Sequence, residues 1–288
     1  MHIAVFQQYY HTPDCSNSAR PFSLVKRLVR DHQVTVITTR SWQKRRITYD
    51  FPWEPAGVDL QVYDVPYQNA MGVLSRAKSY FSYASKALAT GFQLSEPDVV
   101  IGWSPPLPAA FVASAIAKFK SIPWILEVHD LWPDFPVQMG AVSSPMLTAS
   151  LRLMERALYR SAAHVIALSP DMETHIRGVA PEATTSTIEY GTEPDFVDQL
   201  NLRQVHTLRD QYELPATGIV LYAGSFGRAN AIPTLVQTAR RLRDRSGLCF
   251  VFAGHGYHEP MIRSAAHGLP NVHLLPPQPR RRALALFR

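Results

Sequence analysis

The chain has 288 residues, of which 46% are hydrophobic and 18% are charged, a composition that supports a packed core and excludes an intrinsically disordered chain. The formal net charge of +6 favours anionic partners such as nucleotide phosphates or an anionic lipid surface. The two cysteines, Cys15 and Cys249, are too few for a disulfide framework or a paired-cysteine metal site.

No segment of the sequence predicts export or membrane crossing. Residues 1–20 lack the basic and apolar stretches of a signal peptide. The longest apolar run, residues 107–117, is shorter than the about 20 residues that span a bilayer. We therefore expect a cytoplasmic protein, for which peripheral contact with the inner face of the membrane stays open. Nucleic acid is not an expected partner, because the sequence has no zinc-finger or aromatic–basic RNA-binding motif.

Strand and helix patterns alternate from residue 1 onward. The first strand, residues 1–6, leads through a loop to a helix that begins at Pro21, and residues 34–38 form the next strand. Further strands are expected at 58–65, 98–101, 123–128, 164–168 and 187–188, and further helices at 71–92, 107–118 and 150–161. Strands that alternate with crossover helices predict a parallel, Rossmann-like sheet.

The periodicity breaks at residues 191–195, which combine glycine, proline and acidic side chains. The pattern then restarts, with strands expected at 218–223, 248–253 and 271–275 and helices at 232–245, 259–267 and 283–288. We therefore expect an α/β protein with two Rossmann-like domains, residues 1–188 and 189–288. The second domain is expected to be incomplete, because a doubly wound sheet has about five or six strands.

Two glycine turns follow strands of the second domain. Glycine lets the backbone approach a ligand closely, and a helix N-terminus beyond the turn attracts an anion. Either turn alone is better explained as an ordinary tight turn, but two turns at one sheet edge favour a phosphate site. The residues expected to bind the donor are Gly224, Ser225, Gly227, Arg228, Gly254 and Gly256.

The strand that ends near residue 128 carries ionisable side chains at its carboxyl end. In a strand, Glu127 and His129 share one face and Asp130 takes the other. Such groups are costly unless they face a cleft, so we favour a catalytic role for these three over a role in capping a turn. The loop after the first strand, with Ser18 and Arg20, can reach the same edge or be a plain surface loop.

The helix expected at residues 71–92 mixes aromatic side chains with Lys78 and Lys86. Such a helix can lie on a membrane surface or contact a lipid-linked acceptor. Aromatic side chains more often anchor a helix in a core, and we favour that interpretation here.

Taken together, these segments resemble bacterial retaining glycosyltransferases of family 4 with the GT-B fold, in particular the subgroup of colanic-acid, capsule and O-antigen synthesis. The resemblance covers essentially the whole chain in order, and the run from Asp130 to Pro133 is its most specific part. The segments that carry it are residues 18–21, 97–100, 104–106, 127–133, 167–169, 188–196, 222–227, 252–256 and 271–272.

The resemblance implies that the first domain holds the acceptor, with Ser18 and Arg20 on its side. The second domain would hold a UDP- or GDP-linked sugar donor, with transfer in the cleft between them. His129 matches a histidine near the transferred sugar, and the turn that includes Gly224 and Gly227 matches the loop near the donor diphosphate. The acceptor would be a lipid-linked molecule or a saccharide in cell-surface polysaccharide synthesis. Neither a metal nor another cofactor is expected.

The sequence departs from this family pattern in two places. Ser225 and Asn230 stand where many relatives have an arginine and a lysine that grip the diphosphate. A pair of glutamates that contacts the donor is absent from the 288 residues, so we expect weak or absent transferase activity. Two alternatives stay open: a non-catalytic fragment that binds an acceptor or a partner, and a nucleotide-sugar epimerase with Asp130 and Glu127 as its acid and base. A Rossmann dehydrogenase is disfavoured, because no G-x-G-x-x-G motif follows the first strand.

Overall fold

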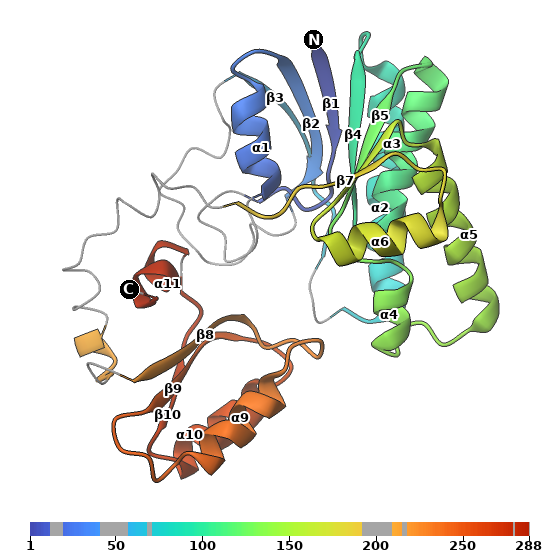
Figure 1. Cartoon of the computed structure of the whole chain (residues 1–288). Coiled ribbons are helices and arrows are strands. Elements are labelled where there is room, and N and C mark those ends of the chain that lie inside the picture. The colour runs from blue at the N-terminus through green and yellow to red at the C-terminus, as the bar shows by residue number, and fades with distance from the viewer. Residues whose placement is uncertain are drawn as a thin grey trace. The chain divides into compact units, whose positions relative to one another are not determined.

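The computed structural model of the chain describes residues 1–11, 20–40, 57–67, 71–191, 209–214, 218–278 and 280–287. They form two compact units (Figure 1). The first unit ends at Gly191, and the second comprises the described residues from Arg209 onward. Each unit is built on its own parallel sheet.

The first unit contains a seven-stranded parallel sheet in the order β3-β2-β1-β4-β5-β6-β7. Its strands are β1 (His2–Phe6), β2 (Gln33–Thr39), β3 (Val58–Tyr63), β4 (Val99–Ser104), β5 (Trp124–Val128), β6 (His164–Ala167) and β7 (Thr185–Thr187). The strand order reverses between β1 and β4. In open α/β sheets, ligands bind at the carboxyl ends of the strands near such a reversal.

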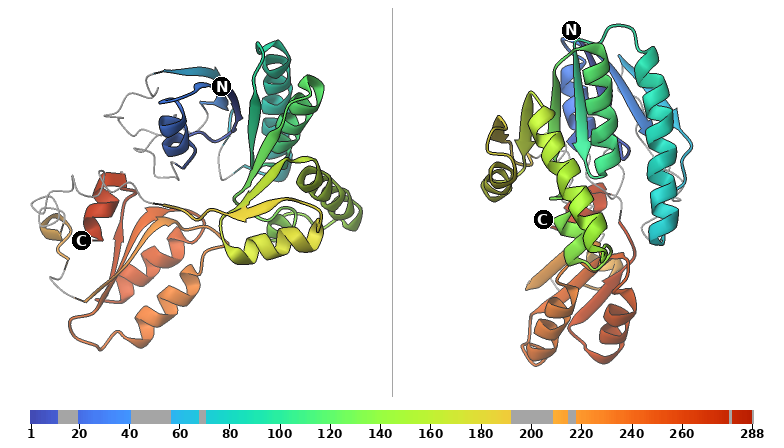
Figure 2. Two further views of the ribbon diagram at one scale, coloured as in Figure 1. Left: turned by 45° about the horizontal axis from the view of Figure 1, so that its top comes forward. Right: turned by 90° about the vertical axis from the view of Figure 1, so that its right-hand side faces the viewer.

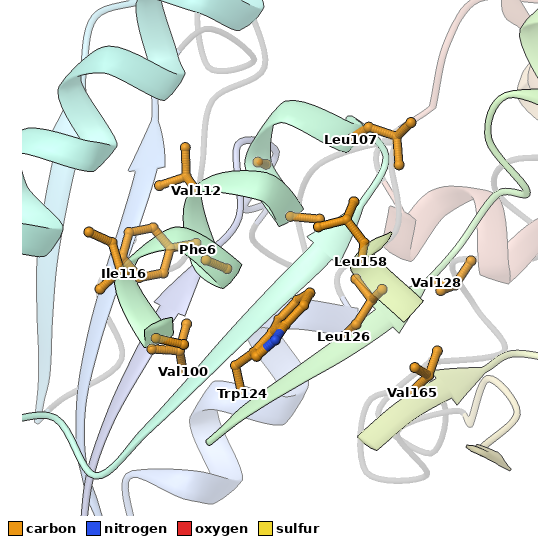
Figure 3. Packing of buried hydrophobic residues seen from close by; sticks show 14 of the residues in the cluster. Phe6, Val100, Leu107, Val112, Ile116, Trp124, Leu126, Val128, Leu158 and Val165 are labelled. Atoms are coloured by element: carbon orange, nitrogen blue, oxygen red, sulfur yellow. The ribbon is translucent and has the colours of Figure 1, made fainter. Parts of the chain in front are cut away.

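Successive side chains of β1 pack alternately into two separate hydrophobic cores. Ile3 and Val5 belong to the core on one side of the sheet, whereas Ala4 and Phe6 belong to the core on the other. Phe6 packs near Ile116 on the second side (Figure 3). Because both faces are covered, the strand is apolar without a break from Ile3 to Phe6, as buried parallel strands are.

The helices of the first unit are α1 (Arg20–Leu28), α2 (Val73–Gln93), α3 (Leu107–Lys120), α4 (Asp134–Gln138), α5 (Pro145–Ser161) and α6 (Pro170–Val179). Figure 2 shows them against the strands from two further directions. Among the described helices, none is both long and apolar enough to cross a bilayer.

Helix α5 begins five residues before its predicted start at Ser150. The side chain of Ser144 accepts a hydrogen bond from the Leu147 amide, and Pro145 occupies the first turn. Serine followed by proline is a strong helix start, because the hydroxyl satisfies an amide that the helix leaves free and proline has none to lose. The prediction placed the start too late because it followed the apolar periodicity and not the cap.

The second unit contains a three-stranded parallel sheet in the order β10-β9-β8. Its elements are β8 (Ile219–Ser225), α9 (Ile232–Arg241), β9 (Cys249–His255), α10 (Glu259–Gly268), β10 (Val272–Leu275) and α11 (Arg280–Leu286). Phe226, Ile232 and Phe252 are fully buried in the core between the sheet and the helices. Helix α9 ends at Arg241, before the predicted Arg245, and the chain turns at Gly247 with a φ of +79°.

Candidate active site

A buried carboxylate stands at the carboxyl end of β5. Glu127 is 1% exposed, and its Oε1 accepts hydrogen bonds from Arg20 Nε at 2.5 Å and from His129 Nε2 at 2.8 Å. Glu127 and His129 therefore lie on the same side of the strand, as strand alternation predicts. One carboxylate oxygen joins two side chains that the sequence analysis assigned to different parts of the site.

Neighbouring strands position this carboxylate near the point where the sheet order reverses. Helix α1, which begins with Arg20, follows β1, and β4 pairs with both β1 and β5. The backbone amide of His129 donates to the Ser104 carbonyl at 2.7 Å, so the pairing of β4 with β5 continues to the site. The site is thus fixed by the sheet and not by a free loop.

The residues that follow β7 also contact Arg20. Arg20 donates to the carbonyls of Ile188 at 3.1 Å and Glu189 at 2.9 Å. Its guanidinium also lies 5.1 Å from the centre of the Tyr190 ring, within cation–π range. Arg20 therefore ties together the start of α1, the end of β5 and the residues beyond β7.

Tyr190 is a member of the site that the sequence analysis did not name. Its hydroxyl lies 3.0 Å from His129 Nδ1, and the two rings meet edge to face with centroids 5.6 Å apart. The side chain is 50% exposed. Its position three residues after a strand end is the signal that could have identified it, because strand ends share one edge of a parallel sheet.

The network holds Glu127 in its ionised form. Burial raises the pKa of the Glu127 carboxyl, but the hydrogen bonds and positive charges of His129 and Arg20 outweigh burial and hold that pKa below its ordinary value. Glu127 is therefore a carboxylate that only accepts, so His129 Nε2 carries a proton. The positive charge that lowers the Glu127 pKa belongs to the imidazolium form of His129, in which both ring nitrogens donate. In the neutral form, Nδ1 accepts a hydrogen bond from the Tyr190 hydroxyl.

Asp130 and Ser18 are not part of this network as described. Burial raises the pKa of the Asp130 carboxyl, and the nearby His129 opposes that rise. Within the described residues, the Asp130 side chain makes no hydrogen bond or ion pair. Ser18 lies outside the described residues.

A second cluster of titratable side chains lies among α4, α5 and α6. Asp134 accepts a hydrogen bond from Arg152 Nη2 at 2.7 Å, and His175 Nε2 lies 3.7 Å from Asp134 and 3.8 Å from Glu155. Burial raises the pKa of the Glu155 carboxyl to about 7, against the hydrogen bond that Tyr159 donates to it. Asp134 thus pairs with a neighbouring helix and does not reach the Glu127 network.

The glycine turns of the second unit lie side by side at the carboxyl ends of β8 and β9, with Gly224 opposite Gly254 in register. A Cβ atom at Gly254 would lie 1.9 Å from the Gly224 carbonyl oxygen. A Cβ atom at Gly256 would lie 2.9 Å from backbone atoms of Phe226. Close packing of backbone on backbone accounts for Gly254 and Gly256, so these two glycines do not by themselves indicate a ligand.

Gly227 differs from this pair. The atoms nearest to a Cβ built there are Asn230 Oδ1 and Ser225 Oγ, each at 3.6 Å, which is ordinary van der Waals contact. Its φ also lies outside the left-handed range. Neither packing nor backbone conformation requires glycine at position 227. Close approach of a ligand would explain the glycine.

Asn230 and Arg228 are both engaged in the first glycine turn. Asn230 Nδ2 donates to the Ser225 carbonyl at 2.8 Å, and the Tyr222 hydroxyl donates to the same oxygen at 2.7 Å. The Arg228 guanidinium lies 4.2 Å from the centre of the Tyr257 ring. Asn230 therefore closes the loop, and Arg228 supplies the positive charge beside it.

The turn leads into α9, whose first residues have no side-chain cap. Within that first turn, the Ile232 amide donates to the Asn230 carbonyl at 2.7 Å, the Leu235 amide donates to the Ala231 carbonyl at 3.1 Å and Pro233 has no amide N–H. The Thr234 amide is therefore the group of this turn that can meet an anion. Across the described ranges, no group of three or more His, Cys, Asp or Glu side chains could hold a metal ion.

Comparison with known proteins identifies the first unit. Residues 19–191 match the family described as the glycosyl transferase 4-like domain. The chain belongs to this family. WcaI of Escherichia coli K12, named as a glycosyl transferase of colanic acid biosynthesis, is 27% identical over 192 residues, which cover 64% of this chain and 46% of WcaI. The chain spans about half the length of this curated relative.

Solved structures share the fold over nearly the whole chain. HepE of Anabaena, solved with UDP-glucose, has a TM-score of 0.63 and 14% identity, covering 99% of this chain and 71% of HepE. Sucrose-phosphate synthase of Thermosynechococcus elongatus has a TM-score of 0.63 and 14% identity, covering 99% of this chain and 73% of the synthase. WaaG, a glycosyltransferase of lipopolysaccharide biosynthesis, has a TM-score of 0.60 and 16% identity, covering 99% of this chain and 72% of WaaG. The predicted GT-B fold class and the predicted family are thereby confirmed.

Proposed function

We propose that the chain is a retaining glycosyltransferase of cell-surface polysaccharide synthesis. It would move a sugar from a UDP- or GDP-linked donor to a lipid-linked or saccharide acceptor. The observation that carries this proposal is the buried network of Glu127, His129 and Arg20 at the sheet edge of a unit that matches the family. The names of WcaI and WaaG support the polysaccharide role, and the UDP-glucose bound to HepE supports the donor class.

Sugar transfer makes two chemical demands on such a site. The bond between the anomeric carbon and the donor phosphate oxygen breaks, and negative charge builds up on the leaving diphosphate. The acceptor hydroxyl bonds to the anomeric carbon and passes its proton to the leaving diphosphate oxygen. The Arg228 guanidinium and the Thr234 amide at the start of α9 suit the first demand, because fixed donors and charges stabilise a developing anion. No metal ion is needed for this step in our proposal.

The Glu127 network suits the positioning of hydroxyl groups. The carboxylate holds the His129 ring through Nε2, so the neutral form of the ring offers Nδ1 as an acceptor. In the structure, the hydroxyl of the half-exposed residue Tyr190 lies at hydrogen-bond distance from Nδ1. A sugar hydroxyl that replaced it would find an acceptor already oriented by a buried charge. Asp130 lies next to His129, and its raised pKa keeps it a candidate for proton exchange.

Nucleotide binding tests the proposal against a non-catalytic fragment, which binds no donor. We expect UDP or GDP to raise the melting temperature of the chain with increasing concentration, and the matching monophosphate to raise it less. Arg228→Ala should weaken diphosphate binding by about tenfold, the loss of one charge-assisted contact.

Arg263→Ala is the matched control for this test, because it also removes an exposed arginine of the second unit, one that pairs with Glu259 on α10. We expect it to bind the diphosphate like the wild type. The proposal fails if neither UDP, GDP nor their sugars shift the melting temperature, or if both variants lose binding equally.

A further inference from the structure

Helix α2 presents large apolar side chains to solvent. Leu74 is 71% exposed, Phe81 is 75% exposed and Phe92 is 46% exposed. Seven residues separate the first pair and eleven the second, which are close to two and three full helical turns. The three side chains therefore lie along one stripe of the helix. The prediction that aromatic residues here pack in the core is right for the fully buried Tyr83 and wrong for Phe81 and Phe92.

Helix α3 extends this apolar stripe. Phe119 is 66% exposed and meets Phe92 edge to face, with ring centroids 4.8 Å apart. Phe111, 50% exposed, lies about two turns earlier on α3. The two helices pack side by side, as the right-hand view of Figure 2 shows. We call the surface formed by Leu74, Phe81, Phe92, Phe111 and Phe119 the α2–α3 face.

The charges on these two helices are all positive. Neither helix contains an Asp or Glu residue, whereas α2 carries Arg76, Lys78 and Lys86 and α3 carries Lys118 and Lys120. Lys78 and Lys118 are exposed beside the apolar side chains.

Other charged side chains near the α2–α3 face make contacts within the chain or lie beyond the end of α2. Lys86 lies 5.8 Å from the centre of the Tyr63 ring, and Lys120 donates to the Leu94 carbonyl at 2.7 Å. The acids that follow α2 in sequence, Glu96 and Asp98, lie beyond its end, and Asp98 accepts a hydrogen bond from the His2 amide. Lys78 and Lys118 are therefore the cations that the α2–α3 face offers to a partner.

We propose that the α2–α3 face binds the surface of a lipid bilayer that contains anionic lipid. Exposed phenylalanines can enter the boundary between headgroups and acyl chains, while the lysines contact anionic headgroups. The absence of carboxylates from both helices removes the repulsion that such a surface would otherwise meet. A protein partner or a second copy of the chain would also cover apolar side chains, but a uniformly basic face suits an anionic lipid better. The inference deepens the proposed function, because a lipid-linked acceptor resides in such a bilayer.

Vesicle flotation tests this inference directly. We expect the chain to float with vesicles of phosphatidylcholine and phosphatidylglycerol, and to bind vesicles of phosphatidylcholine alone much more weakly. The double variant Phe81→Ser/Phe119→Ser should lower the affinity for the mixed vesicles by about tenfold or more, because two exposed phenylalanines lose their apolar burial. Lys78→Glu/Lys118→Glu should remove the preference for the anionic lipid.

The matched control replaces exposed apolar side chains on another helix. Met146 and Leu153 on α5 are 80% and 72% exposed, and Met146→Ser/Leu153→Ser should float like the wild type. Equal flotation of all variants would overturn the inference, as would a wild-type dimer that Phe81→Ser/Phe119→Ser converts to a monomer without loss of lipid binding. UDP binding in solution separates the two proposals, because the α2–α3 variants should keep it unchanged.

Discussion

Glu127→Gln is expected to lower the free energy of unfolding by about 2–3 kcal/mol at neutral pH. The carboxylate is 1% exposed and receives Arg20 and His129 on one oxygen. Glutamine preserves the size of the side chain but removes the negative charge, so the hydrogen bonds from Arg20 and His129 lose their charged acceptor. Denaturant unfolding followed by a signal from the first unit measures the difference.

The loss of stability caused by Glu127→Gln should depend on pH. Because the pKa of Glu127 is held below its ordinary value in the folded chain, its stabilisation is present above the unfolded pKa of about 4.3 and is lost as pH falls through the folded pKa. Wild type and Glu127→Gln should therefore converge in strongly acidic solution. Glu182→Gln is the control, because its ion pair with Arg160 is largely exposed and should contribute at most about 1 kcal/mol. Equal costs for the two variants at neutral pH would contradict our account of the network.

Gly254→Ala is expected to destabilise the second unit by about 3 kcal/mol or more. The added methyl would lie 1.9 Å from the Gly224 carbonyl oxygen, which belongs to the paired strand β8. This clash is relieved only if β8 and β9 separate at their carboxyl ends. Hydrogen exchange of the β8 and β9 amides and the melting temperature of the second unit report this loss.

Gly227→Ala is the paired variant with the opposite expectation. Its methyl would meet atoms no closer than 3.6 Å, so the melting temperature without ligand should stay at the wild-type value. Affinity for UDP or GDP should fall by about tenfold or more, because the methyl occupies the space where we place the diphosphate. Our assignment of the loop is wrong if Gly227→Ala binds the diphosphate normally, and our packing argument is wrong if Gly254→Ala melts like the wild type.

Much of the fold could be predicted from the sequence because local pattern and tertiary environment agree. The uninterrupted apolar run of β1 predicts a strand buried on both faces, and the structure places its alternate residues in two cores. The pairing of Glu127 with His129 follows from strand alternation alone. These features depend on spacing within one element, which a single sequence displays.

Other features depend on contacts between distant segments and could not be predicted in this way. The bond from Arg20 to Glu127 joins residues that are 107 positions apart. Tyr190 reaches His129 across 61 positions, and its place three residues after the end of β7 does not show which side chain of the sheet edge it contacts. Gly227 and Gly254 look alike in the sequence, and only the atoms around them show that packing explains one and not the other.

The central claim is that a donor sugar is transferred at His129. Nuclear magnetic resonance of the histidine side chains tests it without requiring turnover, with the His129 signals assigned by comparison with His129→Gln. We expect a nucleotide sugar that binds the chain to shift the ring signals of His129, and the corresponding free nucleoside diphosphate to leave them in place. If nucleotide sugars bind and none of them moves those signals beyond the effect of the diphosphate, the transferred sugar does not lie at this network and the account is wrong.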